Sequence, residues 1–173
     1  MKNLNIILSS LLILSISISA CKKDDDDEKE ANTNLFVEIN RDVANYYIGT
    51  PDIVEGNGNV HGFIKVRYNT IAAAALDSTG KLPIDSVFPK GSVVVKEIYS
   101  SINGGFIQFA VMKKDPGNKY AGAGWLWGEY KSGGEVTFSV AKKGNGCISC
   151  HSLPDNRDLN RVLICIESWI RMY

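Results

Sequence analysis

Apolar and β-branched residues recur in short runs over the second half of the chain, with glycine-containing segments between the runs. The four runs cover residues 92–99, 105–114, 125–130 and 135–141. Runs of this length and composition, separated by turn residues, are typical of strands joined by short connections. In the last run Val136, Phe138 and Val140 alternate with polar residues, as in a sheet with one solvated face. We therefore predict an antiparallel β-meander packed with a few short helices, a mainly β arrangement of the α+β class.

The other patterns predict helices and one further strand. Residues 40–49 fit a short helix that ends at Gly49, and residues 63–68 alternate apolar and basic side chains like a half-buried strand. The alanine-rich stretch from Thr70 favours a second helix. After Asp158 the apolar residues recur at helical spacing: Leu159, Val162, Leu163, Ile166 and Ile170. We expect this last segment to form an amphipathic helix that covers the apolar face of the sheet.

The N-terminal 20 residues have the pattern of a secretory signal peptide. Lys2 precedes an apolar run from Leu4 to Ile18, and small residues lead up to Cys21. A cysteine directly after such a cleavage site is typical of a bacterial lipoprotein, so we predict lipidation of Cys21 and an exported chain anchored in the bacterial cell envelope, in the periplasm or at the outer membrane. The alternative is a retained membrane helix, because a run of roughly 15 to 17 apolar residues is near the short limit for a span.

Residues 21–34 carry a block of like charge, "KKDDDDEKE", without apolar periodicity. Such a segment buries too little surface to offset its chain entropy, so we expect a solvated, lipidated tether between the anchor and the domain. An acidic metal-binding tract is the alternative. Residues 35–173 remain and are enough for one domain with a core of its own.

The overall charge excludes one class of partner. Lysine plus arginine and aspartate plus glutamate both number 19, and no basic stripe with interleaved aromatic residues occurs. The sequence therefore gives no indication of nucleic-acid binding, and we expect a small-molecule partner.

Two of the four cysteines and one of the two histidines lie within five residues, at Cys147, Cys150 and His151. C-x-x-C-H is the spacing of c-type haem attachment, in which both thiols bond to the haem vinyl groups and the histidine becomes an axial ligand of the iron. A thioredoxin-type pair would need a βαβ context, and a zinc site would have to recruit Cys165 and His61 at spacings that match no zinc module. A plain disulfide leaves His151 unexplained. We predict covalently bound haem c.

Four motifs follow one another along the chain: "FPKGSVVVKEIY", "FAVMKK", "GAGWLWGEY" and "GNGCISCHS", with Asp158 soon after the last. Together they resemble the cytochrome P-460 family, whose relatives include the β-type cytochromes c′, over residues 69–162. The resemblance implies a mainly β fold and a five-coordinate haem c with an open distal face, often in a homodimer. Members with the P-460 chromophore link a lysine to the porphyrin and oxidise hydroxylamine. The β-type cytochromes c′ lack that link and bind nitric oxide or similar gases.

The lysine of the link and a general base are candidates on the predicted strands. Lys96 lies in an otherwise apolar row with Val94 and Ile98, and a buried amine becomes nucleophilic because burial lowers its pKa. A lysine that reaches water from a sheet edge is the alternative, and Lys113 is the next candidate. Glu129 or Glu97 would serve as a base if either faces the haem.

The sixth iron position separates two functions. An open position allows a small nitrogen compound, such as hydroxylamine or nitric oxide, to bind, with its oxidation as the enzymatic possibility. Closure by His61 or Met112 would give an electron carrier with a soluble or membrane redox partner. We expect His61 to be an exposed loop residue and Met112 a strand core residue. A lipoprotein with a Cys147–Cys150 disulfide and no haem is a third hypothesis, and we expect Cys165 to be buried in the last helix.

Overall fold

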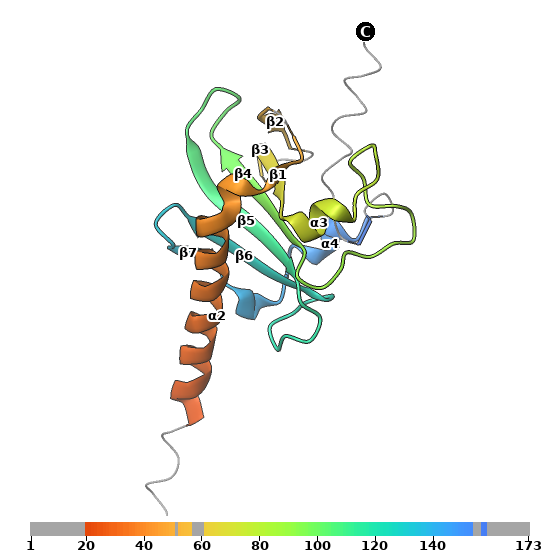
Figure 1. Ribbon diagram of the computed structural model, residues 1–173. Coiled ribbons are helices and arrows are strands. Elements are labelled where there is room, and N and C mark those ends of the chain that lie inside the picture. Colours follow the sequence, from red (N-terminus) through yellow and green to blue (C-terminus); the bar gives the residue numbers. More distant parts are fainter. Residues whose placement is uncertain (1–19, 51, 57–60, 154–156, 159–173) are drawn as a thin grey trace, which may run out of the picture.

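The computed structural model describes residues 20–50, 52–56, 61–153 and 157–158. Figure 1 shows a long helix, α2, on one side of a curved sheet and the short helices α3 and α4 on the other side of the view. In this part of the chain no helix has the length and apolar character needed to cross a membrane. The predicted signal peptide, apart from Ala20, and the predicted helix after Asp158 with Cys165 lie outside the described residues.

The strands of the described residues form one antiparallel sheet. Its spatial order is β1-β3-β4-β5-β6-β7, and β2 also pairs with β3. The strands are β1 (Tyr47–Ile48), β2 (Val54–Glu55), β3 (Phe63–Tyr68), β4 (Val93–Tyr99), β5 (Phe106–Lys114), β6 (Trp125–Lys131) and β7 (Val136–Phe138). Since β4 to β7 are neighbours in chain order, the predicted meander and the mainly β fold class are confirmed.

The helices lie between and beside these strands. They are α2 (Ala20–Asp42), the 3₁₀ turn η1 (Val43–Asn45), α3 (Thr70–Ala74), the 3₁₀ turn η2 (Val140–Lys142) and α4 (Ile148–His151). The predicted helix at Thr70 is confirmed, and it begins there because the Asn69 side chain accepts a hydrogen bond from the Ala72 amide. The predicted helix at 40–49 is wrong beyond Asn45, since the chain enters β1 at Tyr47.

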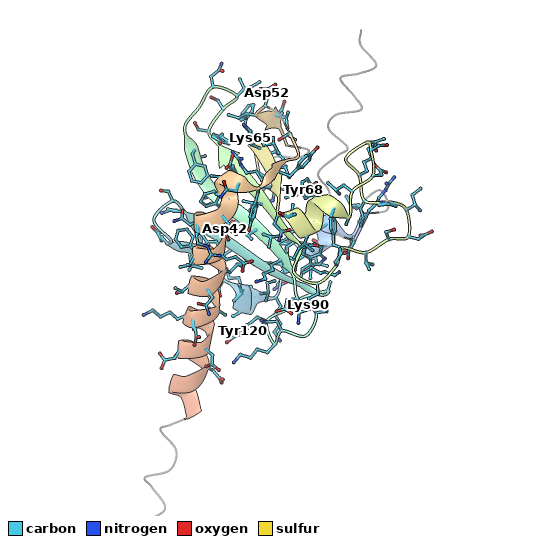
Figure 2. All side chains as sticks on the ribbon, viewed as in Figure 1. Asp42, Asp52, Lys65, Tyr68, Lys90 and Tyr120 are labelled. Carbon is cyan, nitrogen blue, oxygen red and sulfur yellow. The ribbon has the colours of Figure 1, made fainter. Side chains whose placement is uncertain are left out.

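Both faces of the sheet are buried, which corrects the prediction of one solvated face. Residues 93–98 of β4 are all buried. One face carries Val94, Ile98, Met112, Trp125 and Trp127, together with Tyr68, which is labelled in Figure 2 and stacks on Phe88. The other face carries Val93, Val95, Phe109, Val111 and Leu126 and is covered by α2. We call the first of these the motif face, because Cys147 and Ile148 pack against it.

The prediction for the strand at 135–141 is wrong at its end. The strand stops at Phe138, and Val136 is 42 % exposed. Ser139 caps η2 by accepting a hydrogen bond from the Ala141 amide, so the chain leaves the sheet there. Val140 is therefore buried from a helical turn and not from a strand.

The predicted tether at 21–34 is helical, so the expectation of an unstructured chain is wrong, while lipidation of Cys21 stays a prediction. The C-terminal half of the helix packs on the sheet, because Leu35 and Ile39 of α2 and Val43 of η1 recur every four residues and are buried. Burial of one apolar face supplies most of the stability of a protein helix, and once formed it propagates cheaply into the acidic residues.

Candidate functional site

The C-x-x-C-H motif forms the short helix α4 and the turn before it. The Cys147 amide donates to the Gly144 carbonyl at 2.9 Å, and the His151 amide donates to the Cys147 carbonyl at 3.1 Å. Cys147 is half-buried and Cys150 is exposed. The helical turn therefore brings the two thiols and the imidazole to one short segment at the motif face.

The imidazole of His151 is buried, with 7 % of the residue exposed. Its ring meets the Trp127 ring edge to face, with the centroids 5.2 Å apart. The Trp127 indole nitrogen in turn donates to the Gly122 carbonyl at 3.0 Å. Trp127 is thus a residue that orients the predicted axial ligand, and a buried aromatic with a satisfied N–H is well suited to hold it.

Glycine is required where the chain passes over Trp127. Gly144 has φ +70°, and a Cβ there would lie 2.6 Å from the indole ring. Gly122 is equally close to the same segment, because its Cβ would lie 1.8 Å from the Lys143 carbonyl oxygen. Only the absence of side chains lets the backbone before Cys147 approach the sheet this closely.

Substitution of Gly144 by alanine is expected to lower the free energy of unfolding by about 2–3 kcal/mol, because a left-handed backbone and a clash with Trp127 add together. Gly146→Ala is the matched control. Gly146 also has a left-handed φ, of +89°, but a Cβ there meets nothing within 4 Å. It should lose only about 1 kcal/mol. Urea denaturation of both variants gives the comparison, and equal losses would contradict the role of Trp127.

The cross-strand register places Lys96 and Glu129 in one row. Lys96 pairs with Val66 and Ala110, and Ala110 pairs with Glu129. Directly paired residues point to the same face of a sheet. Lys96 is only 8 % exposed, so it is a buried amine on the motif face and not a side chain that reaches water from an edge.

The charges on this face are close enough to influence one another. Burial raises the pKa of Glu129, and the hydrogen bond from Gln108 (3.0 Å) and the charges of Lys142 and Lys96 oppose this rise. Burial also raises the pKa of Cys147, with a smaller increase from Glu129. Lys96 and Glu129 therefore share one row of the sheet and lie near enough to Cys147 for their charges to affect its pKa.

The other candidates for these roles lie elsewhere. Glu97 is on the opposite face, where it accepts from Arg67 at 2.8 Å and from the Tyr99 hydroxyl at 3.0 Å. Lys113 is also on that face and pairs with Glu38 of α2 at 2.6 Å. Neither side chain can act at Cys147, which leaves Lys96 and Glu129 as the candidates.

The two candidates for the sixth iron position differ in placement. Met112 is a buried core residue, as predicted, and pairs with Val94 and Trp127. His61 lies in a turn, as predicted, but it is half-buried and not exposed. Burial and then the nearby Lys96 charge lower its pKa to about 4. His61 is therefore a neutral imidazole near Lys96 at neutral pH.

Asp158 ties the segment after the motif back to the fold. Its carboxylate is 8 % exposed and accepts from the Lys114 ammonium at 2.7 and 2.9 Å. It also accepts from the Phe88 amide at 2.8 Å and from the Trp125 indole at 3.4 Å. Asp158 thus attaches the segment after the motif to Lys114, Phe88 and Trp125. The sequence analysis named Asp158 only as part of the resemblance.

Four residues of the site escaped the sequence reasoning: Trp127, Gly122, Gln108 and Lys142. The string "GAGWLWGEY" contained the signal for the first two, because a glycine-rich turn before two tryptophans indicates close approach of the backbone to large rings. Within the described ranges no group of three or more His, Cys, Asp and Glu side chains is placed to hold a metal ion by itself.

Comparison with known families gives one match. The sequence model described as Cytochrome P460 matches residues 45–160, more than half of the chain. The matched region runs from the end of η1 past Asp158 and so contains the whole motif face. No curated protein matches the sequence.

Proposed function

The chain belongs to the cytochrome P460 family, which implies a haem cofactor, and we propose that its haem is of the c type, held by Cys147 and Cys150 with His151 as iron ligand. We further propose that the iron has an open position, where it binds small nitrogen compounds such as hydroxylamine or nitric oxide and oxidises hydroxylamine. The observation that carries the proposal is the convergence of Lys96, Glu129 and Cys147 on the motif face.

The residues present fit a haem group. Two thiols three positions apart flank one turn, the following histidine is buried, and the face beside them is apolar. A porphyrin is a large apolar plane, so it is stabilised by contact with such a face. Gly146, directly before Cys147, has no side chain, and the position of its Cβ is open space, so it does not block a ring there.

When bound, the haem supplies an iron that coordinates the small ligand and exchanges electrons with a redox partner. Lys96 holds a buried amine at the motif face and is our candidate for the lysine that bonds to the porphyrin in members with the P-460 chromophore. Glu129 accepts the proton that a bound nitrogen compound loses. Trp127 keeps the His151 imidazole in place and excludes water from its buried edge.

The first experiment is expression of the full chain with a c-type haem maturation system. A haem-stained denaturing gel tests covalent attachment, and the spectrum of the dithionite-reduced protein tests the lysine link. A reduced Soret band far to the red of an ordinary ferrous c haem is expected, and Lys96→Arg should return it to the ordinary position because a guanidinium stays protonated and does not form the link. Hydroxylamine-dependent reduction of an electron acceptor then tests the activity.

Glu129→Gln is expected to lower the rate of hydroxylamine oxidation by about 10²–10⁴-fold. Burial raises the pKa of Glu129, so the carboxylate takes up its proton at a higher pH than an exposed glutamate does. The wild-type rate should therefore fall as the pH drops through this raised pKa, and the variant should lack that decline. Glu135→Gln changes an exposed glutamate and is the control. A pH profile of the variant that keeps the wild-type shape argues against Glu129 as the base.

A second candidate function, electron transfer without catalysis, is favoured by His61. Its imidazole is neutral and lies near Lys96, so it is the side chain best suited to close the sixth position. A six-coordinate spectrum that His61→Ala converts to a five-coordinate one would select this function. Intact nitric oxide binding without acceptor reduction would instead select a gas-binding protein.

The proposed location follows from the N-terminal sequence. We propose that the mature chain lies in the bacterial cell envelope, is anchored by lipid at Cys21, exchanges electrons with a soluble or membrane redox partner and forms a homodimer. Incorporation of a radiolabelled fatty acid that is lost in Cys21→Ser tests the anchor. Sedimentation of the haem-loaded protein tests the dimer.

A further inference from the structure

Helix α2 lies outside the residues that match the family, yet it is joined to the segment that leads into the haem motif. Residues 20–42 precede the matched region, which begins at residue 45. Asn32 in the middle of this helix is 4 % exposed, although its side chain is polar. A buried amide is stabilising only when its hydrogen bonds are satisfied, so its partners define what it holds.

The Asn32 side chain makes four hydrogen bonds, two through its oxygen and two through its nitrogen. Its Oδ1 accepts from the Val140 amide at 3.1 Å and from the Tyr130 hydroxyl at 3.3 Å. Its Nδ2 donates to the Ser139 hydroxyl oxygen at 3.0 Å and to the Glu28 carbonyl at 3.0 Å. One side chain of α2 therefore holds two successive residues at the start of η2.

Glu28 strengthens the same link one turn earlier. The Ser139 hydroxyl donates to the Glu28 carboxylate at 2.5 Å, and its oxygen also caps the Ala141 amide at 3.1 Å. A hydrogen bond to a charged acceptor is roughly twice as strong as a neutral one. The cap of η2 is thus completed by α2 and not by the sheet.

From η2 the chain reaches Cys147 through successive hydrogen-bonded turns. The Lys142 amide donates to the Ser139 carbonyl at 3.1 Å, and the Asn145 amide donates to the Lys142 carbonyl at 2.9 Å. The Cys147 amide then donates to the Gly144 carbonyl at 2.9 Å. No extended stretch separates Ser139 from Cys147, so a displacement at the first is transmitted towards the second.

Lys142 is the residue of η2 whose charge affects Glu129 and Cys147. Its ammonium lies over the Phe138 ring, 4.9 Å from the centroid. Its charge also lowers the pKa of both Glu129 and Cys147. The groups that face Glu129 are therefore Lys96 from β4, Gln108 from β5, Lys142 from η2 and the Cys147 thiol.

We propose that Asn32 is a positioning residue of the haem site: through Ser139 and Val140 it fixes η2 and thereby sets where the Lys142 charge lies relative to Glu129 and Cys147. The inference rests on the haem of the proposed function, and it does not depend on hydroxylamine oxidation. It makes α2 part of the site, in addition to its part in the core.

The test uses the haem-loaded full chain and compares three variants. Asn32→Ala removes the link, Asn34→Ala makes the same change at an exposed position two residues on, and Leu35→Ala removes a buried core contact of the same helix. Hydrogen exchange followed by mass spectrometry reports on a peptide that covers residues 136–146. We expect exchange roughly tenfold faster there in Asn32→Ala, the ratio that loss of one or two buried hydrogen bonds gives. Leu35→Ala should lower the thermal midpoint without this local change.

The haem reduction potential supplies a readout that a structural role would not move. Removal of a positive charge near the iron favours the ferric form, so Lys142→Ala should lower the potential. Asn32→Ala should shift it in the same direction, and the double variant should match Lys142→Ala alone. Asn34→Ala should change neither the potential nor the exchange.

A different set of results would overturn the proposal. If Asn32→Ala behaves like Leu35→Ala, with a lower midpoint but unchanged potential and no selective exchange, then Asn32 has only a structural role. If Asn32→Ala does not fold, Ser139→Ala breaks the link from η2 and must give the same two shifts. A haem-free gel would mark failure of the proposed function, and the exchange measurement would still report on the Asn32 link.

Discussion

Replacement of both Cys147 and Cys150 by serine is expected to abolish covalent haem entirely. The two thiols are the attachment points that the motif provides, and serine hydroxyls of similar size do not bond to haem vinyl groups. The fold should remain, because Cys150 is exposed and Cys147 is only half-buried. Haem staining of a denaturing gel, with the intact mass of the protein, gives the measurement.

Cys165→Ala is the control for this prediction, since it removes the cysteine that belongs neither to the motif nor to the predicted lipidation site at Cys21. It should keep the full haem stain. A double serine variant that still carries covalent haem would refute the assignment of Cys147 and Cys150, and a wild-type mass equal to the chain less two hydrogens would favour the disulfide hypothesis.

Replacement of Asp158 by alanine is expected to lower the free energy of unfolding by about 3–5 kcal/mol, the usual range for removal of one partner of a buried ion pair. The reason is that Lys114, whose side chain is 12 % exposed, would lose its counter-ion. The Phe88 amide and the Trp125 indole would lose an acceptor as well. Denaturant titration monitored by tryptophan fluorescence measures the loss.

Asp115→Ala is the matched control for Asp158. Asp115 also pairs with a lysine, at 3.0 Å, but that Lys90 side chain is 71 % exposed. Exposed ion pairs contribute about 0–1 kcal/mol, so the control should lose little. If the two alanine variants lose the same free energy of unfolding, the buried contacts of Asp158 do not hold the segment after the motif in solution.

The sheet could be predicted because its signal is local. In β4 and β5, β-branched and aromatic residues occupy consecutive positions between glycine turns, and this pattern needs no knowledge of the partner strand. Helix α2 could not be predicted in the same way. The acidic residues before Asn32 have no apolar stripe. Leu35 and Ile39 are buried because they pack with residues such as Val93 and Leu126, which are distant in sequence.

The residues of the candidate site also differ in whether local sequence or tertiary packing determines them. Cys147, Cys150 and His151 could be predicted because their spacing is a property of one helical turn. Lys96 and Glu129 could be named singly from strand alternation, but their meeting depends on the register that sets Lys96 opposite Ala110 and Ala110 opposite Glu129. The contact of Trp127 with His151 depends on tertiary packing, and the glycine-rich string before Trp127 indicates a close approach of the backbone but not this partner.

The helical form of the acidic segment bears on how an anchored protein would meet its partners. A flexible tether lets a domain explore a shell around its anchor, whereas a helix extends about 1.5 Å per residue and resists bending. From Cys21 to Asn32 this gives about 16 Å of helix between the predicted anchor point and the first buried contact. With lipid at Cys21, this helix would limit how close to the bilayer and how far from it the domain can lie. Such a geometry raises the effective concentration towards electron acceptors in the same membrane and lowers it towards acceptors that diffuse freely.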